Sequence, residues 1–120
     1  MNTQIEIIKS RALDGMRSYM AACVEDGLDP GYAEEDIASC QSILDEFLQS
    51  LSAAPQPNEA EVLGALQSAV LSLNRLNEKC EFGLIETDQR EDLAALFILA
   101  AHSAGVGDGQ DDLTEPWREW

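Results

Sequence analysis

The stretch "LAALFILAA", residues 93–101, decides the fold, because it is the longest unbroken apolar run in the chain. Nine residues are too few to cross a membrane, which takes about 20 residues. They are enough for more than two turns of helix, so a helix built from them has no side left for water. We therefore expect a helix over residues 87–103 that is the most buried element of the molecule.

The preceding residues, "GLIETDQRED" at positions 83–92, are polar. The first four amides of a helix have no partners within the helix, and Thr87 or Asp88 can accept hydrogen bonds from them. Glu86 and Arg90 lie four residues apart, close enough for an ion pair if the helix reaches back to Glu86. An arginine in this turn opposes the helix dipole, which suggests that a carboxylate holds it. The run is therefore both a helix start and a candidate binding cluster.

Three further segments repeat apolar residues at steps of three and four, the spacing of one helix face. The four expected helices span residues 3–26, 33–53, 58–80 and 87–103. The apolar stripe of the first is Ile5, Ile8, Ala12, Met16, Tyr19 and Cys23, widened by Met20 and Val24. Those of the next two are Ile37, Cys40, Leu44, Phe47, Leu48 and Leu51; and Val62, Leu63, Leu66, Val70 and Leu73, continued by Leu76 or Asn77. We expect one all-α domain over residues 1–120, a four-helix bundle or a similar orthogonal array with a short turn at about 114–120.

Turn and capping residues set the expected helix ends. Asn58 followed by Glu61 forms a box-like N-cap, and Gly27 is a suitable C-terminal stop. Asp29 is expected to cap the second helix. Gly15 inside the first helix costs about 1 kcal/mol relative to alanine, which suggests that it permits a close helix crossing.

The charge balance is strongly acidic, with 7 basic and 23 acidic residues and a formal net charge of −16. No lysine or arginine occurs between Arg17 and Arg75. Such a chain repels nucleic-acid phosphates and anionic lipids, so we expect neither a nucleic-acid nor a membrane partner. The same charge attracts a basic protein or cations, and it also serves as an ordinary solvated surface.

The cysteines, Cys23, Cys40 and Cys80, are odd in number and form no Cys-x-x-Cys motif. This pattern is typical of buried, reduced thiols in a reducing cytosol. The first 20 residues carry several charges and no apolar signal region. We therefore expect a cytoplasmic protein.

Residue patterns for known catalytic chemistry are missing from the sequence. His102 is the only histidine, and the Glu-x-x-His pair of di-iron bundles fails because Leu99 stands three residues before it. "GVGDGQ" breaks the Gly-x-Gly-x-x-Gly pattern at Gln110, and "DGQDD" lacks the spacing of a calcium loop. We expect no catalytic residues, no cofactor and no metal, and a protein that is not an enzyme.

The chain ends in "WREW", residues 117–120. Trp117 and Trp120 share a face in a helical turn, where they would either dock on the core or form an exposed aromatic and arginine patch. Arg118 can pair with Glu86, which would join the two polar stretches in space. The candidate binding or structural cluster comprises Glu86, Thr87, Arg90, Trp117, Arg118 and Trp120.

Residues 62–120 resemble a family of small, acidic, helical bacterial proteins of unknown function. The resemblance rests on an Ile-Glu-Thr motif, a following Arg-Glu and an Arg-x-Trp ending, at Ile85, Glu86, Thr87, Arg90, Glu91, Arg118 and Trp120. It implies a helical fold and a bacterial origin, and it assigns no activity.

Three functions fit these features. The first is a non-catalytic protein-binding module whose acidic face holds a basic partner; its sharpest form is an immunity or antitoxin protein that imitates the anionic substrate of a basic toxin. The second is a structural or assembly protein that forms a homodimer through spare apolar positions at Leu71 and Leu76. The third is a small-molecule site around Glu86, Arg90 and Arg118.

Overall fold

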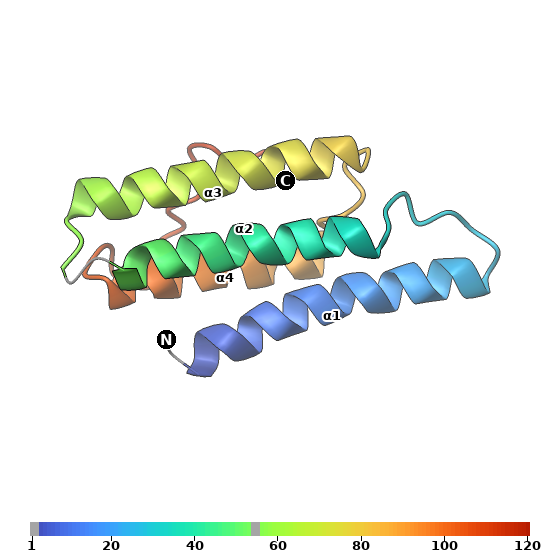
Figure 1. Ribbon diagram of the computed structural model, residues 1–120, viewed down its shortest axis with the longest axis horizontal. Coiled ribbons are helices and arrows are strands. Elements are labelled where there is room, and N and C mark those ends of the chain that lie inside the picture. The colour runs from blue at the N-terminus through green and yellow to red at the C-terminus, as the bar shows by residue number, and fades with distance from the viewer. Residues whose placement is uncertain (1–2, 54–55) are drawn as a thin grey trace.

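The computed structural model describes residues 3–53 and 56–120, and within them it shows four helices and no strand (Figure 1). The helices are α1, Thr3–Glu25; α2, Glu34–Ala53; α3, Glu59–Lys79; and α4, Thr87–Ser103. Each bound lies within one residue of the range that the apolar spacing predicts. The predicted all-α four-helix bundle is confirmed.

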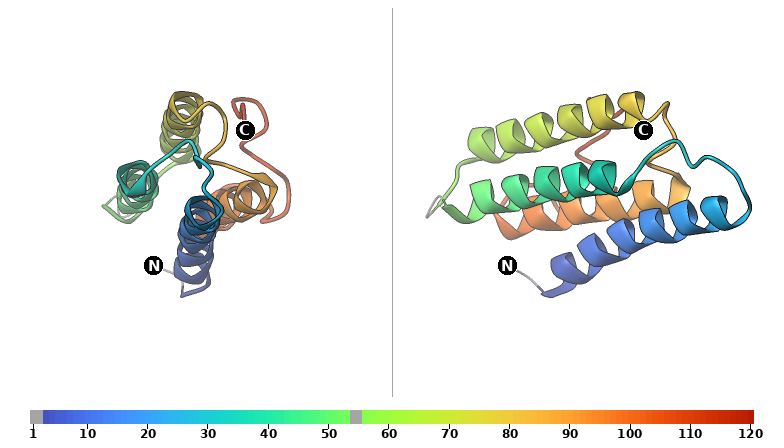
Figure 2. Two further views of the ribbon diagram at one scale, coloured as in Figure 1. Left: turned by 90° about the vertical axis from the view of Figure 1, so that its right-hand side faces the viewer. Right: turned by 45° about the vertical axis from the view of Figure 1, so that its right-hand side comes forward.

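The helices follow one another around the bundle axis in chain order (Figure 2). α1 packs most extensively on α4, and α2 packs on α3, whereas α3 and α4 make the least direct contact of the neighbouring pairs. The segment after α4 returns along the outside of the bundle and lies beside α3 and α4 (Figure 2). It thereby covers the seam that these two helices leave between them.

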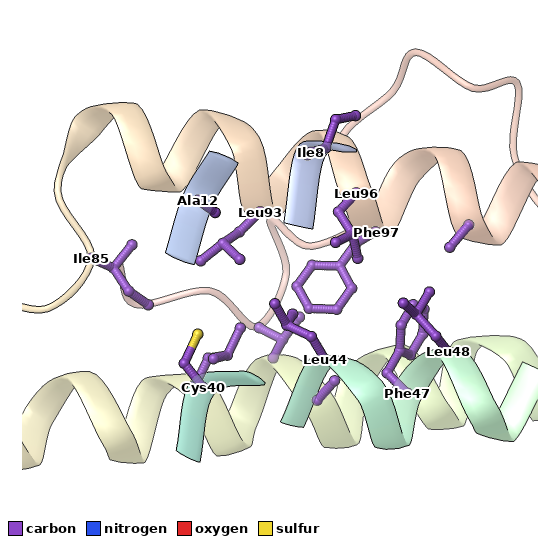
Figure 3. Packing of buried hydrophobic residues seen from close by; sticks show 14 of the residues in the cluster. Ile8, Ala12, Cys40, Leu44, Phe47, Leu48, Ile85, Leu93, Leu96 and Phe97 are labelled. Carbon is purple, nitrogen blue, oxygen red and sulfur yellow. The ribbon is translucent and has the colours of Figure 1, made fainter. Parts of the chain in front are cut away.

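The run at residues 93–101 is enclosed as expected, since none of its residues is exposed. Leu93, Leu96 and Phe97 are fully buried and point toward α2 (Figure 3). The Phe97 ring meets the Phe47 ring edge-on, with 5.0 Å between their centroids. Burying a side chain of this size contributes roughly 1.5–3 kcal/mol, so this contact is a main link between α4 and α2.

The apolar stripes agree with the sequence in α2 and depart from it in α1. All six expected stripe residues of α2 are buried. In α1, Leu13 is buried, whereas Tyr19 and Val24, both expected in the stripe, are 46% and 65% exposed. Tyr32, from the connection between α1 and α2, is buried beside this part of α1. Its hydroxyl donates to the Met16 carbonyl over 2.9 Å. Tyr19 stacks on the Tyr32 ring from outside, with 6.4 Å between centroids, because Tyr32 fills the interior there.

Two helix ends form as predicted: the start of α3 at Asn58 and the end of α1 at Gly27. Asn58 and Glu61 exchange side-chain and backbone hydrogen bonds of 2.8 and 3.3 Å at the start of α3. Gly27 follows α1 with φ of 75°, and the Leu28 amide donates to the Cys23 carbonyl over 2.7 Å. This is the Schellman arrangement, in which a left-handed glycine satisfies the last free carbonyls of a helix.

The predicted Asp29 cap is wrong. The Asp29 carboxylate accepts from the Gly31 amide over 2.8 Å, which closes a turn ahead of the helix. The start of α2 is fixed by Asp36, whose carboxylate accepts from the Ala33 amide over 2.9 Å and from Lys79 Nζ over 3.1 Å. The amide hydrogen bond, followed by the Lys79 contact, lowers the pKa of Asp36 from its ordinary value. Asp36 thus joins the start of α2 to the end of α3.

Candidate functional site

The polar run before residue 93 forms the start of α4, with Glu86 as N-cap and Thr87 as the first helical residue. The predicted cap at Thr87 or Asp88 is therefore wrong by one or two positions. The reason is Gln89, whose side-chain oxygen reaches back and accepts from the Glu86 amide over 3.3 Å. Gln89 also lies against Gly15: a Cβ added there would be 2.6 Å from Gln89 Nε2, so the glycine admits a side chain of α4.

The expected ion pair between Glu86 and Arg90 is not among the ion pairs of residues 3–53 and 56–120. Glu86 and Thr87 are exposed, and Arg90 is half-buried. The backbone of Glu86 is extended, with φ of −92° and ψ of 179°. Its carbonyl accepts from the Arg90 amide over 2.8 Å, so the two residues are one turn apart, but the non-helical backbone of an N-cap orients its side chain differently from that of a residue within the helix. The rule for ion pairs within a helix therefore does not apply.

The C-terminal residues form a turn at 113–117 and not a helix. The Thr114 carbonyl accepts from the amides of Trp117 and Arg118 over 3.1 and 2.9 Å. The side chains of Trp117 and Trp120 are half-buried and pack against the core. The two tryptophans therefore attach this segment to the bundle.

Arg118 pairs with Asp112 and not with Glu86, which corrects the second predicted ion pair. Its guanidinium donates to the Asp112 carboxylate over 2.7 Å, and its carbon lies 5.4 Å from the centroid of the Trp120 ring. Asp112 also accepts from the amide and the hydroxyl of Thr114. A partner six residues away is reached by closing a short loop, which costs less chain entropy than a distant one.

Two buried asparagines of α3, which the sequence did not single out as site residues, organise this region. Asn74 donates to the Trp117 carbonyl over 2.7 Å and accepts from the Glu119 amide over 3.0 Å. Asn77 accepts from the Ile85 amide over 3.0 Å. Both interrupt the apolar stripe of α3, and a polar residue in such a stripe signals a buried hydrogen-bonding role.

The predicted cluster is thus divided between two places. Glu86, Thr87 and Arg90 lie at the start of α4, and the other three residues lie in the segment held by Asn74. Three of the surface grooves in the described part of the chain have volumes of about 670, 300 and 370 Å³, and Glu86, Arg90 and Arg118 line none of these three. The largest follows the outer face of α1.

The cysteine thiols are buried in the core, and the His102 ring is hydrogen-bonded to the backbone. All three cysteines are free and buried, and burial raises the pKa of Cys40 to about 12. Cys40 is therefore a protonated thiol at neutral pH, which is a poor nucleophile.

Nδ1 of His102 lies 3.0 Å from the Gly107 carbonyl, and it must carry the proton because a carbonyl only accepts. Among the described residues, no group of three or more potential ligand side chains is placed to hold a metal ion.

Most of the basic side chains form ion pairs with acidic side chains of the same chain. Lys9, Arg11, Arg17, Lys79 and Arg118 form ion pairs with acids of the same chain, at 2.7–3.4 Å. Seven of the 23 acidic side chains take part in them, which leaves sixteen without an ion pair to any described residue. The surface therefore carries a surplus of carboxylates that the chain does not neutralise.

No helix in residues 3–53 or 56–120 is both long enough and apolar enough to span a bilayer. The resemblance to small acidic bacterial proteins remains an expectation of the sequence. Comparisons of the chain with protein-family models, with curated proteins and with solved structures found no match.

Proposed function

We propose that this chain is a non-catalytic, acidic, helical protein-binding module of the cytoplasm that holds a basic partner. The observation that carries the proposal is the surplus of sixteen carboxylates without an ion pair to any described residue. A partner that brings lysines and arginines gains from this field, in both association rate and specificity. The three buried free thiols suit a reducing compartment.

The sharpest form of the proposal is an immunity or antitoxin protein that neutralises a basic toxin, such as a nuclease. Carboxylates fixed on packed helices can imitate the anionic substrate of such an enzyme. Eight of the sixteen lie in the packed helices, where the backbone needs little further ordering on binding.

The test is affinity capture from a lysate of the source organism on the immobilised chain. We expect a basic protein that is retained at about 50 mM salt and released by about 500 mM, with an affinity that falls at least tenfold between these salts. A variant with six exposed acids changed to their amides serves as the control and should retain much less. The proposal fails if no basic protein is recovered, or if the captured protein binds equally well at both salts.

Two alternative functions, a homodimer and a small-molecule site, are tested separately. The homodimer was expected to use Leu71 and Leu76, but Leu76 is only 8% exposed and Leu71 is half-buried, so this surface is smaller than expected. Light scattering that shows a monomer at high concentration would eliminate it. The small-molecule site around Glu86, Arg90 and Arg118 predicts a rise in melting temperature with anionic metabolites, and no response across a broad library counts against it.

A further inference from the structure

Two connections of the chain meet at one end of the bundle (Figure 1). Residues 26–33 join α1 to α2, and residues 80–86 join α3 to α4. A Cβ added to Gly83 would lie 3.9 Å from the Pro30 carbonyl oxygen, so the two connections touch. We call this region, together with the last two turns of α1, the loop end.

Exposed apolar side chains concentrate at the loop end. Five large apolar side chains are exposed among the described residues, and four of them lie here: Tyr19, Val24, Leu28 and Phe82. The fifth, Ile7, lies near the other end of α1. A single exposed apolar residue needs no explanation, but the accumulation of four at one end of the bundle favours a place where another molecule binds.

Leu28 and Phe82 hold equivalent positions in two helix ends of the same type. The Leu28 amide donates to the Cys23 carbonyl and the Phe82 amide to the Asn77 carbonyl, each over 2.7 Å. In this motif the apolar residue commonly folds back onto the helix. Val106 does so at the equivalent end of α4, where it is 6% exposed, whereas Leu28 and Phe82 are 62% and 60% exposed. The two side chains at the loop end are therefore directed outward.

The backbone at Phe82 is also unfavourable. Glu81 and Phe82 both have positive φ values, of 56° and 62°. The corresponding left-handed residues after α1 and α4 are glycines, Gly27 and Gly105. A left-handed conformation is disfavoured for residues with a Cβ, and such strain collects at sites with a function. The chain thus keeps an exposed phenylalanine on a strained turn.

Carboxylates flank these apolar side chains along the chain. Exposed acids at the loop end that make no ion pair to a described residue include Glu25, Asp26, Asp29, Glu81 and Glu86, and Glu78 lies next to them in the last turn of α3. Two of the nearby cations are engaged, since Arg17 pairs with Glu34 and Lys79 pairs with Asp36. The third, Arg90, is half-buried at the start of α4 and makes no ion pair with a described residue, so acids still outnumber free cations here. The loop end therefore combines an apolar centre with an uncompensated negative rim.

We propose that the loop end is the docking surface for a cationic, amphipathic segment of the partner protein, whose apolar side chains cover Leu28 and Phe82 while its lysines and arginines meet the rim. The inference rests on the proposed function, in that the partner is basic. A second copy of this chain does not fit, because two chains of charge −16 would bring two negative rims together. Nucleic acids and anionic membranes are repelled for the same reason.

The test uses two synthetic peptides of equal length and positive charge, followed by two-dimensional NMR of the isotope-labelled chain at low salt. One peptide carries leucines and a tryptophan on one helical face, and the other carries serines in their place. We expect the amphipathic peptide to bind about tenfold more tightly and to shift the amide signals of residues 24–33 and 78–86. Phe82→Ser and Leu28→Ser together should remove this advantage.

Ile7→Ser is the matched control, because Ile7 is 58% exposed but lies away from the loop end, and it should leave the affinity unchanged. Val24→Ser tests the same surface within regular helix, should the variants in the turns fail to fold. The inference is overturned if neither peptide binds, if the shifted signals lie elsewhere, or if Ile7→Ser weakens binding as much as the loop-end variants. The proposed function is decided separately by the capture experiment, so either idea can fail alone.

Discussion

Asn74 holds the C-terminal segment with both ends of its amide, since it donates to the Trp117 carbonyl and accepts from the Glu119 amide. The side chain is buried, with 7% exposure, so water cannot replace either bond without opening the structure. A carboxylate at this position only accepts, so it would lose the bond to the Trp117 carbonyl, and a hydroxyl would have to make both bonds through one oxygen atom. One side chain therefore fixes the cover over the seam between α3 and α4.

Replacement of Asn74 by alanine should lower the free energy of unfolding by about 1–3 kcal/mol, because two backbone groups of the C-terminal segment lose their hydrogen-bond partner. Trp117 and Trp120 are the only tryptophans, so their fluorescence should shift to longer wavelength if the segment detaches. Urea titration and emission spectra measure both effects. Gln67→Ala, at an exposed amide on the same helix, should change neither. An Asn74→Ala protein with unchanged stability and emission would contradict the clamp.

We expect the protein to be less stable with glutamate at position 81 than with glycine, because the φ of 56° there is unfavourable for a residue with a Cβ. Glu81→Gly should raise the free energy of unfolding by about 1 kcal/mol. Glu25→Gly, in the last turn of α1, should instead lower it by about 1 kcal/mol. Thermal unfolding of the two variants makes the comparison. Equal destabilisation by both would show that the turn after α3 is not left-handed in solution.

Helix boundaries are the feature that the sequence predicts best, because the signals that set them are local. Apolar spacing gives the buried face, and a capping pair such as Asn58 and Glu61 gives the first turn. Ion pairs are predicted less well, because they depend on where the chain returns after a turn. Arg118 had partners of equal chemistry in Glu86 and Asp112, and only the turn at 113–117 selects Asp112.

Local patterns also do not predict which of two candidate side chains fills the same space in the core. Tyr19 continues the apolar stripe of α1, yet Tyr32 from the next connection is the one that is buried there. Asn74 could have been recognised, because it breaks an otherwise apolar stripe, although its partners in the C-terminal segment could not. The fold of this chain is therefore readable from local patterns, and the division of the candidate cluster is not.

The cap of α3 gives a test at this level of structure. Asn58→Ala should lower the free energy of unfolding by about 0.5–2 kcal/mol, since the Glu61 amide loses its acceptor. Asn58→Asp keeps an acceptor at the positive end of the helix dipole and should retain stability. Chemical denaturation followed by circular dichroism compares the two variants. Equal losses in both would argue that side-chain packing, and not capping, is what Asn58 contributes.

The molecule as a whole should lose stability in alkali. Burial raises the pKa of Cys40 from 9.0 and of Tyr32 from 10.0, each to about 12. A group with a raised pKa in the folded state stabilises the fold fully below its unfolded pKa, and this contribution is lost as the pH rises through the folded value. We therefore expect the free energy of unfolding to decline above about pH 9, with the largest losses between pH 10 and 12.

Urea unfolding at a series of pH values from 7 to 11 measures this decline. Cys40→Ala removes one of the two titrating groups, so its stability should fall less steeply between pH 9 and 11 than that of the parent chain. Because Cys40 is wholly buried, the variant is compared by slope and not by absolute stability. A parent chain whose stability is constant up to pH 11 would show that these two groups are open to solvent.

The pairing of α1 with α4 has a consequence for biosynthesis. A hairpin of α2 and α3 brings together neighbours in the chain, whereas α1 must wait until residues 87–103 have left the ribosome before its main partner exists. Throughout that interval Ile5, Ile8 and Met16 have only the contacts of α2 to cover them. The apolar face of α1 therefore stays partly uncovered and open to chaperones until α4 has been synthesised, and a pause in translation between α3 and α4 would prolong that exposure.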